Sequence, residues 1–284
     1  MIERDADAPL VALTIAGFDP SGGAGVIADI KTFTSFGCFA TAAVTSLTFQ
    51  NTRGVFGAAH QSAEAVRAQV LPILEDFRVA GAKTGMLPTR EVILEVARLA
   101  RETALPALVV DPVVRSTSGY DLIDDEALAA LKAELLPLAR VVTPNIPEAE
   151  RITGIERIED EAGMRRAARR IRELGARAVL VKGGHLGGRE AVDVLDDEGR
   201  VSIFRAPRIE SNATHGTGCT LAAAIVACLA RGMNLEEAVR KAKRFVTDAI
   251  RYAPQIGGGH SPVNHSVAVR FDGGEVSREK EDGD

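Results

Sequence analysis

Short apolar runs alternate with amphipathic, helix-length segments along most of the chain, and this alternation limits the possible folds more than any other feature. The expected strands cover 10–16, 39–49, 55–60, 79–82, 108–110, 141–142, 178–181, 191–195 and 201–204. The expected helices cover 26–34, 62–77, 89–102, 124–136, 160–174, 221–230 and 234–252. Strands that alternate with helices form a mostly parallel sheet covered on both faces. The sequence therefore predicts an α/β fold.

The domain organisation follows from length and from the evenness of the pattern. A chain of 284 residues is long enough for one large or two small domains. Since no linker or break in composition interrupts the alternation, one domain over residues 1–284 is predicted. Residues 1–8 and about 272–284 are charged and poor in apolar side chains, so both ends are expected to be flexible.

Charge and cysteine content bear on partners and location. The net charge of −5 does not favour a nucleic-acid surface, and no run approaches the roughly 20 apolar residues of a membrane span. The three cysteines, Cys38, Cys219 and Cys228, include no CxxC pair, and free thiols suit a reducing compartment. The N-terminus has no apolar signal segment. We expect a cytoplasmic protein with neither nucleic-acid nor membrane partners.

A glycine-rich stretch, Gly17–Gly25, follows the first expected strand and opens a helix. It matches neither the G-x-x-x-x-G-K-[ST] loop of P-loop proteins nor the G-x-G-x-x-G fingerprint of dinucleotide binders. The simplest interpretation is a turn between strand and helix. Four glycines and an aspartate exceed what such a turn needs, which favours a ligand-binding loop.

A second glycine-rich stretch, Asn212–Thr220, runs into the apolar segment 221–230. Gly216 and Gly218 would free backbone N–H groups at the start of a helix, where unpaired donors and the helix dipole attract anions. The dipole is also expected to lower the pKa of Cys219. The alternative is that both glycines merely make a tight turn.

Polar clusters follow the expected strands and should meet at one edge of the sheet, where ligands bind in open α/β sheets. These clusters are 17–19, 50–51, 83–86, Asp111, Asn145 with Glu148, 182–185, and the turn 216–219. Each has a plain alternative, since Asp111 could form a turn, Asn145 and Glu148 could cap a helix, and Lys182 could be a surface charge. Their shared edge favours a functional site.

The chemistry of these side chains points to phosphoryl transfer, which depends mostly on positioning and electrostatics. Asp111, Asn145 and Glu148 offer oxygen atoms for a divalent cation, and Lys182 is a candidate partner for nucleotide phosphates. The N–H groups of Gly216, Thr217, Gly218 and Cys219 could stabilise charge on the transferred group. Cys219 is the candidate base for the attacking hydroxyl.

Taken together, these segments resemble the bacterial hydroxymethylpyrimidine/phosphomethylpyrimidine kinases, a family of the ribokinase-like superfamily. The resemblance covers about 10–265, with the family's segments in the family's order. The matching segments are 12–25 (ALTIAGFDPSGGAG), 50–52 (QNT), 83–87 (KTGML), 111–113 (DPV), 143–150 (TPNIPEAE), 181–185 (VKGGH) and 215–220 (HGTGCT).

The resemblance implies a three-layer α/β/α sandwich with a mostly parallel central sheet. It also implies a homodimer that uses ATP and Mg²⁺ to phosphorylate 4-amino-5-hydroxymethyl-2-methylpyrimidine and then its monophosphate. Residues implied to bind the pyrimidine are Gln50, Gly17, Asp19, Met86 and Val113. Asp111 and Glu148 would organise Mg²⁺, and Cys219 would be the base. Residues implied to lie by ATP are Lys182, Gly183, Gly184, His185, Asp193 and Glu148.

One departure and two alternatives remain. Phe18 stands where the family usually has a small residue, and its ring could narrow the pyrimidine pocket or pack beside it. A pyridoxal or pyridoxine kinase is the nearest alternative, because that substrate also presents a hydroxymethyl group, and only Gln50 and Met86 favour the pyrimidine. A non-catalytic pyrimidine sensor is the second, although it would not need Asp111 or Cys219.

Overall fold

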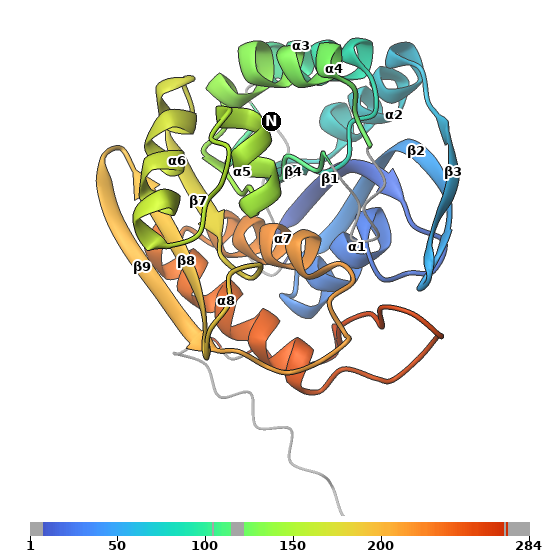
Figure 1. Cartoon of the computed structure of the whole chain (residues 1–284). Coiled ribbons are helices and arrows are strands. Elements are labelled where there is room, and N and C mark those ends of the chain that lie inside the picture. The colour runs from blue at the N-terminus through green and yellow to red at the C-terminus, as the bar shows by residue number, and fades with distance from the viewer. Residues whose placement is uncertain (1–7, 104, 115–121, 270, 272–284) are drawn as a thin grey trace, which may run out of the picture.

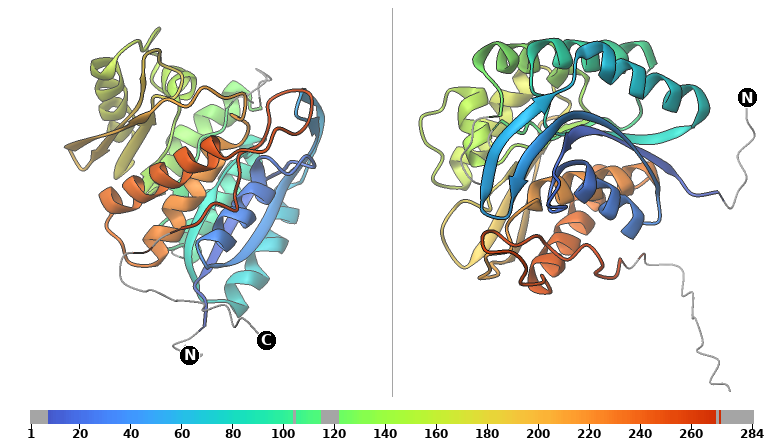
Figure 2. Two further views of the ribbon diagram at one scale, coloured as in Figure 1. Left: turned by 90° about the horizontal axis from the view of Figure 1, so that it is seen from below. Right: turned by 90° about the vertical axis from the view of Figure 1, so that its right-hand side faces the viewer.

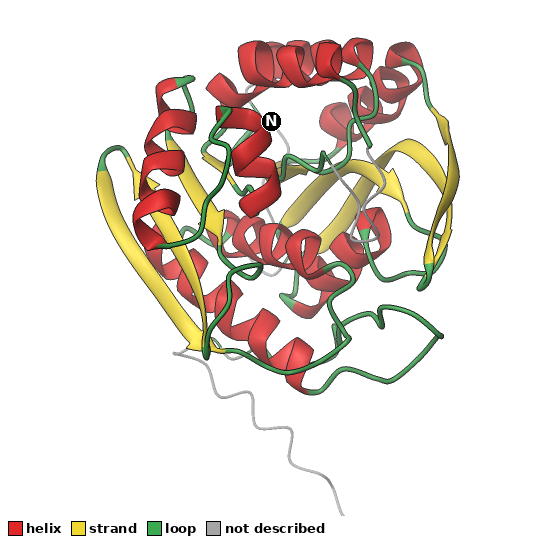
Figure 3. Cartoon of the chain, in the orientation of Figure 1, coloured by secondary structure: helices red, strands yellow, loops and turns green. Residues whose placement is uncertain are grey.

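The computed structural model describes residues 8–103, 105–114, 122–269 and 271. The strands of this part form one sheet in the order β3-β2-β1-β4-β5-β6-β7-β8-β9 (Figures 1 and 3). Their bounds are β1 Val11–Phe18, β2 Phe39–Asn51, β3 Gly54–His60, β4 Val79–Thr84, β5 Val109–Val110, β6 Val141–Val142, β7 Ala178–Lys182, β8 Glu190–Asp197 and β9 Arg200–Pro207.

The centre of the sheet is parallel, as the sequence predicts. Five neighbouring pairs, from β2–β1 to β6–β7, run parallel. The strands β3, β8 and β9 are antiparallel to their neighbours and extend the sheet at its two ends. All parallel strands therefore end at the same edge.

Helices cover both faces of the sheet and make it the middle of three layers (Figure 2). The helix bounds are α1 Gly25–Ser35, α2 Ala63–Asp76, α3 Arg90–Thr103, α4 Asp125–Ala130, α5 Ile146–Thr153, α6 Glu161–Glu173, α7 Thr217–Ala230 and α8 Leu235–Arg251. Buried side chains of α2 to α6 pack on one face, and those of α1, α7 and α8 pack on the other. This confirms the expected sandwich.

The short central strands show why their sequence is apolar throughout. Successive side chains of a strand point to opposite faces, and here both faces are covered. Val109 belongs to the core beneath α7 and α8, whereas Val110 belongs to the core beneath α2 to α6. Val141 and Val142 divide in the same way. Two adjacent valines thus supply both cores.

The helix expected over 124–136 is not one regular α-helix. It begins at Asp125 with an Asp124 cap, becomes a π-helical turn at Leu131–Leu135, and ends in a 3₁₀ turn at Leu136–Leu138. Pro137 lacks a backbone N–H, so it cannot donate the hydrogen bond that an α-helix would need at that position. The predicted flexible ends lie outside the described residues, apart from Ala8. One domain over 1–284 stays a prediction.

Candidate active site

The predicted site residues gather at the edge where the parallel strands end. Gly17 and Gln50 lie within the last residues of β1 and β2, and Lys182 is the last residue of β7. Met86 follows β4, and Asp111 follows β5 directly. The strands β1 and β2 extend further than the sequence suggests, so Gly17 and Gln50 are strand residues and not loop residues.

The glycine-rich loop after β1 is organised by Asp19, whose carboxylate is almost completely buried. One oxygen accepts hydrogen bonds from the Ser21 amide at 2.8 Å and the Ser21 hydroxyl at 2.7 Å. The other accepts from the amides of Gly23 at 3.1 Å and Ala24 at 2.9 Å. Both oxygens of Asp19 are therefore engaged within the loop, and the implied contact with substrate stays a prediction.

His215 ties this loop to the second glycine-rich turn. Its Nε2 lies 2.7 Å from the same Asp19 oxygen that receives the Gly23 and Ala24 amides. Burial disfavours the Asp19 carboxylate, but hydrogen bonds from His215 and Ser21 outweigh burial and lower its pKa. We call the Asp19 carboxylate, together with its partners Ser21, Gly23, Ala24 and His215, the loop clasp.

The turn that precedes α7 needs glycine at position 216. Its φ of +77° lies in the left-handed region, and a Cβ there would stand 1.8 Å from the Gly23 carbonyl oxygen. The helix α7 begins at Thr217, earlier than the apolar run suggests, and has no side-chain cap. The Thr217 N–H donates to the Thr214 carbonyl at 3.5 Å, and the Thr220 N–H donates to the Gly216 carbonyl at 2.9 Å. The N–H groups of Gly218 and Cys219 between them have no carbonyl of a preceding helical turn to bind, so an anion could bind them.

Cys219 lies in the first turn of α7 and is only partly exposed. Burial raises the pKa of its thiol to about 11, although the positive charge of Lys83 acts in the opposite direction. The expected lowering of this pKa is therefore wrong in this structure. The cost of removing a thiolate from water, together with the negative charges of Asp29 and Asp111, exceeds the help from Lys83.

A buried ion pair lies near the thiol, and one of its two members, Asp29, is not among the residues predicted for the site. Lys83 Nζ stands 3.0 Å from Asp29 Oδ2, and both side chains are completely buried. The Thr14 hydroxyl donates to the same oxygen at 2.6 Å, while Asp29 Oδ1 has no partner among the described residues. Burial disfavours charged Lys83, but Asp29 outweighs burial and raises the pKa of Lys83.

A signal for Asp29 was present in the sequence. Val26, Asp29 and Phe33 are spaced three and four residues apart, so they share one face of α1, and all three are buried. A charged residue on the apolar stripe of a helix needs a partner. Lys83, near the end of the expected strand 79–82, was a cation for which the sequence suggested no other partner, so it could have been matched with Asp29.

A second charged cluster lies further along the edge. Lys182 Nζ is 2.8 Å from Asp111 Oδ1 and 4.0 Å from Glu148 Oε2. The Thr143 hydroxyl donates to Asp111 Oδ1 at 2.9 Å. Lys182 is 11% exposed, so it is not the surface charge of the plain alternative. Asn145 and Glu148 do form a capping box on α5, which confirms their structural interpretation without excluding another role.

The two carboxylates of this cluster differ in acidity. Burial, aided by the negative charge of Asp111, raises the pKa of Glu148 to about 7 even though Lys182 opposes the shift. For Asp111, burial is outweighed by Lys182 and Lys83, and its pKa is lowered. A divalent cation here would favour ionised Glu148.

The donor set fits Mg²⁺ better than a metal that needs a protein cage. Within residues 8–103, 105–114, 122–269 and 271, no three His, Cys, Asp or Glu side chains cluster as ligands. Mg²⁺ is commonly held by one or two carboxylates together with phosphates and water. Asp111 and Glu148 match that pattern.

The turn of α7 meets the second cluster directly. A Cβ on Gly218 would lie 3.0 Å from Lys182 Nζ and 3.9 Å from Asp111 Oδ2. The backbone at the start of α7, the lysine and the carboxylates therefore surround one small volume. This juxtaposition is what the shared sheet edge predicts.

The remaining predicted residues vary in their surroundings. A Cβ on Gly17 would lie 3.1 Å from Met86 Sδ, so these two residues are neighbours. Gln50, Phe18 and Val113 are partly exposed at the same edge. Gly183 is buried while Gly184 and His185 are exposed. Asp193 is buried, and its oxygens bind the Gly183 amide and the Lys243 ammonium group.

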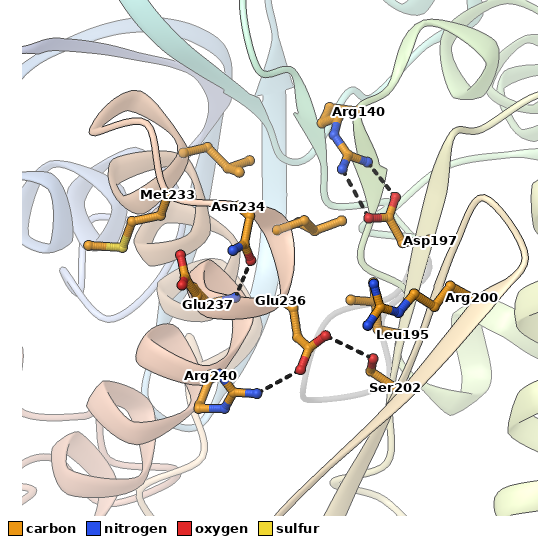
Figure 4. Close-up of a pocket in the computed structure, with 12 residues that line it drawn as sticks. Arg140, Leu195, Asp197, Arg200, Ser202, Met233, Asn234, Glu236, Glu237 and Arg240 are labelled. Carbon is orange, nitrogen blue, oxygen red and sulfur yellow. Dashed lines mark hydrogen bonds and ion pairs between the residues drawn. The ribbon is translucent and has the colours of Figure 1, made fainter.

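A hollow of about 600 Å³ lies apart from these residues (Figure 4). Asp197 and Arg200 border it and pair with each other between β8 and β9, level with the start of β7. The hollow is therefore at the opposite edge of the sheet. Its polar groups are largely paired with one another, as Arg140 is with Asp197 at 2.8 Å.

Fold and site together define an α/β phosphotransferase, with a glycine-rich helix start, a lysine and two carboxylates at the carboxyl edge of a parallel sheet. Comparison with known proteins specifies the class further. The sequence model of the phosphomethylpyrimidine kinase family matches residues 19–264. The chain belongs to the phosphomethylpyrimidine kinase family.

Two curated relatives illustrate the similarity. The hydroxymethylpyrimidine/phosphomethylpyrimidine kinase of Streptomyces coelicolor is 46% identical over 92% of this chain and 96% of its own length. The thiamine biosynthesis bifunctional protein ThiED of Geobacter sulfurreducens is 50% identical over 90% of this chain. The chain spans 52% of the length of that bifunctional protein.

Two solved structures show the same fold. A phosphomethylpyrimidine kinase from Clostridium difficile is 41% identical, with a TM-score of 0.75 over 85% of this chain and 99% of its own. An ADP complex of Bacillus subtilis pyridoxal kinase is 36% identical, with a TM-score of 0.84 over 91% of this chain and 98% of its own. The pyrimidine kinase is thus nearer in sequence, and the pyridoxal kinase is nearer in backbone shape.

Proposed function

We propose that this protein is an ATP-dependent kinase of thiamine biosynthesis. It phosphorylates the hydroxymethyl group of 4-amino-5-hydroxymethyl-2-methylpyrimidine and then phosphorylates the monophosphate to the diphosphate. The observation that carries this proposal is the approach of the Gly218 backbone to Lys182 Nζ and Asp111, in a chain of this family. A phosphoryl group placed there has donors on one side and a cationic side chain on the other.

The nucleotide side of the reaction uses the second charged cluster. Lys182 is placed to neutralise phosphate oxygens, and the amides at the start of α7 are placed to stabilise charge on the transferred group. Asp111 and Glu148 would hold Mg²⁺, which neutralises charge on the nucleotide phosphates when bound. Gly183, Gly184 and His185 form the turn beside Lys182 and are proposed to contact ATP.

Cys219 is proposed as the group that accepts the proton of the attacking hydroxyl. Its pKa of about 11 means that the thiol is mostly protonated at neutral pH. The thiolate is therefore a minor species unless positive charge from Lys83 or from a bound cation lowers the pKa. Turnover should accordingly rise with pH above neutrality.

The acceptor pocket is proposed to lie beside β1, β2 and β4. Gly17 and Met86 are in contact there, and the Met86 carbonyl is fixed by the Thr45 hydroxyl at 2.6 Å. Gln50 and Val113 are the partly exposed side chains proposed to complete the pocket. Asp19 would shape the pocket through the loop clasp, because its oxygens are already engaged.

Pyridoxal is the second candidate substrate. The backbone of this chain superposes better on the pyridoxal kinase than on the pyrimidine kinase described above. Phe18, which departs from the family pattern, lies partly exposed at the end of β1. The greater sequence identity to the pyrimidine kinases supports the pyrimidine as first choice.

Assembly as a homodimer in the cytoplasm is also proposed. Phe49 and Phe56 are 56% and 70% exposed on the hairpin β2–β3, which ends the sheet and offers an apolar surface to a second copy. The cysteines are free, as suits a reducing compartment. Among the described residues, no helix is both long and apolar enough to cross a membrane. Light scattering of the purified protein would test the dimer.

The substrate is tested by parallel turnover measurements. The protein is incubated with Mg-ATP and, separately, hydroxymethylpyrimidine, its monophosphate and pyridoxal, and ADP and product mass are followed. We expect both pyrimidines to be phosphorylated, with a larger kcat/KM than pyridoxal. Turnover of pyridoxal alone would identify pyridoxal as the substrate and would point to Phe18 as the residue that changes the acceptor pocket. Tight pyrimidine binding with no turnover of any acceptor would support the sensor.

A further inference from the structure

After α8 the chain forms a loop that lies against the hairpin β2–β3 (Figures 1 and 2). We call residues 256–262 the bridging loop, and three consecutive glycines, 257–259, lie within it. The His260 amide donates to the Thr52 carbonyl at 2.7 Å, and the Gly259 amide donates to the Thr52 hydroxyl at 3.3 Å. Two backbone amides of the bridging loop therefore bind one residue of the hairpin turn.

Glycine at position 259 permits this close contact. A Cβ on Gly259 would lie 2.0 Å from the Thr52 carbonyl oxygen, which is far below van der Waals contact. The obstructing atom belongs to the backbone, so it cannot turn aside as the end of a flexible side chain could. Any larger residue at position 259 would therefore move the bridging loop and the hairpin turn apart.

The bridging loop also contacts the turn that precedes α7. The His215 amide donates to the Ser261 carbonyl at 3.4 Å, and His260 Nδ1 lies 3.2 Å from the Thr214 hydroxyl oxygen. His215 and Pro262 form a parallel β-bridge. One short segment therefore contacts both the turn of the β2–β3 hairpin and the turn at the start of α7.

Gln50 lies two residues before Thr52, beside an irregularity in the strand pairing. The register of β2 and β3 shifts between Phe49, which pairs with Gly57, and Gln50, which pairs with Val55. Such a bulge interrupts the ladder and increases the local twist, so it changes the direction of nearby side chains. The direction of the Gln50 side chain therefore depends on where the end of the hairpin is held, and the bridging loop holds that end at Thr52.

We infer that the bridging loop positions the acceptor, with Gly259 holding the hairpin end that carries Gln50 at a set distance from the turn at the start of α7. This inference rests on the proposed function, in which Gln50 binds the acceptor and that turn stabilises the transferred phosphoryl group. The acceptor hydroxyl must align with that group, and displacements near 1 Å are enough to slow a reaction about 100-fold. Gly259 acts through Thr52, so it is a positioning residue and not a catalytic one.

The first test is Gly259→Ala, with steady-state kinetics for hydroxymethylpyrimidine and for pyridoxal and with the Kd of Mg-ADP by calorimetry. We expect kcat/KM for the acceptor that the wild type uses to fall by roughly 10- to 100-fold, because the added methyl group displaces the hairpin turn. The Kd of Mg-ADP should stay within about twofold of wild type. Mg-ADP lacks the transferred phosphoryl group, and Lys182 lies on β7, which β1, β4, β5 and β6 separate from the hairpin.

Gly54→Ala is the matched control. Gly54 is the first residue of β3 in the same hairpin, and a Cβ there would meet no described residue within 4 Å apart from its chain neighbours. This variant should keep kcat/KM for the acceptor within about twofold of wild type. An equal fall in Gly54→Ala and Gly259→Ala would overturn the inference, because the hairpin would then respond to any added methyl group.

Thr52→Val covers the case in which Gly259→Ala folds poorly. Valine keeps the shape of threonine and removes only the hydroxyl that accepts the Gly259 N–H. We expect kcat/KM for the acceptor to fall by about 2- to 10-fold, the equivalent of one neutral hydrogen bond, with the Kd of Mg-ADP unchanged. Unchanged acceptor kinetics in this variant, or an equal loss of Mg-ADP affinity, would overturn the inference. A wrong acceptor in the proposed function would show in the wild type alone, so the two failures are distinguishable.

Discussion

The two halves of the site use charge in different ways. On the acceptor side, at the ends of β1, β2 and β4, the charged groups are sealed, with Lys83 and Asp29 completely buried and paired. On the phosphate side, at the ends of β5, β6 and β7, Lys182 is shared between Asp111 and Glu148 and remains partly exposed. On the acceptor side, the charges of Lys83 and Asp29 balance each other. On the phosphate side, one lysine faces two carboxylates, so a bound cation could balance the second carboxylate.

The difference suggests a division of labour. Balanced, buried charges fix the shape of a pocket, whereas the raised pKa of Glu148 marks a carboxylate whose environment is improved by an added cation. Cys219 lies where the two sides meet, since the charges of Lys83, Asp29 and Asp111 all act on it. The predictions below test this division, beginning with the residue at the boundary.

Cys219→Ser should have the largest effect. We expect kcat to fall by about 10²- to 10⁴-fold, the usual contribution of a general base, with little change in the Kd of the pyrimidine. In the wild type, kcat should increase from pH 7 to pH 10 as more thiolate forms, and Cys219→Ser should lose that increase. Turnover equal to wild type would exclude Cys219 as the base and would leave anion binding as the only proposed role of the turn at the start of α7.

Lys83→Met tests whether the acceptor side is sealed. Removing the cation leaves the buried Asp29 carboxylate without a counter-charge, and we expect a loss of about 3–5 kcal/mol in the free energy of unfolding. Chemical denaturation measures this loss. The double variant Lys83→Met with Asp29→Leu should recover much of it. A loss below 1 kcal/mol for the single variant would show that water reaches the pair.

Asp19→Asn tests the loop clasp. The amide cannot accept all five hydrogen bonds, and we expect a loss of about 2 kcal/mol or more at pH 7. Because the folded pKa of Asp19 is lowered, its contribution is present above the usual pKa of 3.8 and is lost as pH falls through the folded value. The Tm difference between wild type and variant should therefore shrink below pH 4. A constant difference would contradict the clasp.

Glu148→Gln should have the smallest effect on stability, with the opposite sign. Its folded pKa of about 7 exceeds the usual 4.5, so the wild type loses stability as pH rises between these values. The glutamine variant should gain about 1–3 kcal/mol relative to wild type at pH 8, the upper end being the full free energy of a pKa shift from 4.5 to about 7, and nothing at pH 4. Thermal denaturation at both pH values, without Mg²⁺, provides the comparison. The variant should also need more Mg²⁺ for half-maximal activity.

Much of the fold could be predicted because the pattern is local. The paired valines of β5 and β6 show burial on two faces, and the strand-end clusters follow from parallel strands sharing an edge. The helix over 124–136 was predicted less well, because apolar spacing does not distinguish an α-helix from the π and 3₁₀ turns around Pro137.

The errors in the site arise from long-range contacts. The pKa of Cys219 depends on burial by distant elements, which a helix-start motif does not reveal. The partners of Asp19 and Asp193, His215 and Lys243, lie 196 and 50 residues away from them in sequence, and the ligand contacts of both aspartates stay predictions. Such pairings are visible only after folding. Asp29 is the exception, because its place among the apolar residues of one helix face could be recognised from the sequence.

The division of labour is tested most directly by binding isotherms of two variants. Gln50→Ala and Lys182→Met are each titrated with hydroxymethylpyrimidine and with Mg-ADP. We expect Gln50→Ala to weaken only the pyrimidine and Lys182→Met to weaken only the nucleotide, each by about tenfold or more, the equivalent of one lost charge-assisted or neutral hydrogen bond. Equal weakening of both ligands by either variant would contradict separate acceptor and phosphate sides.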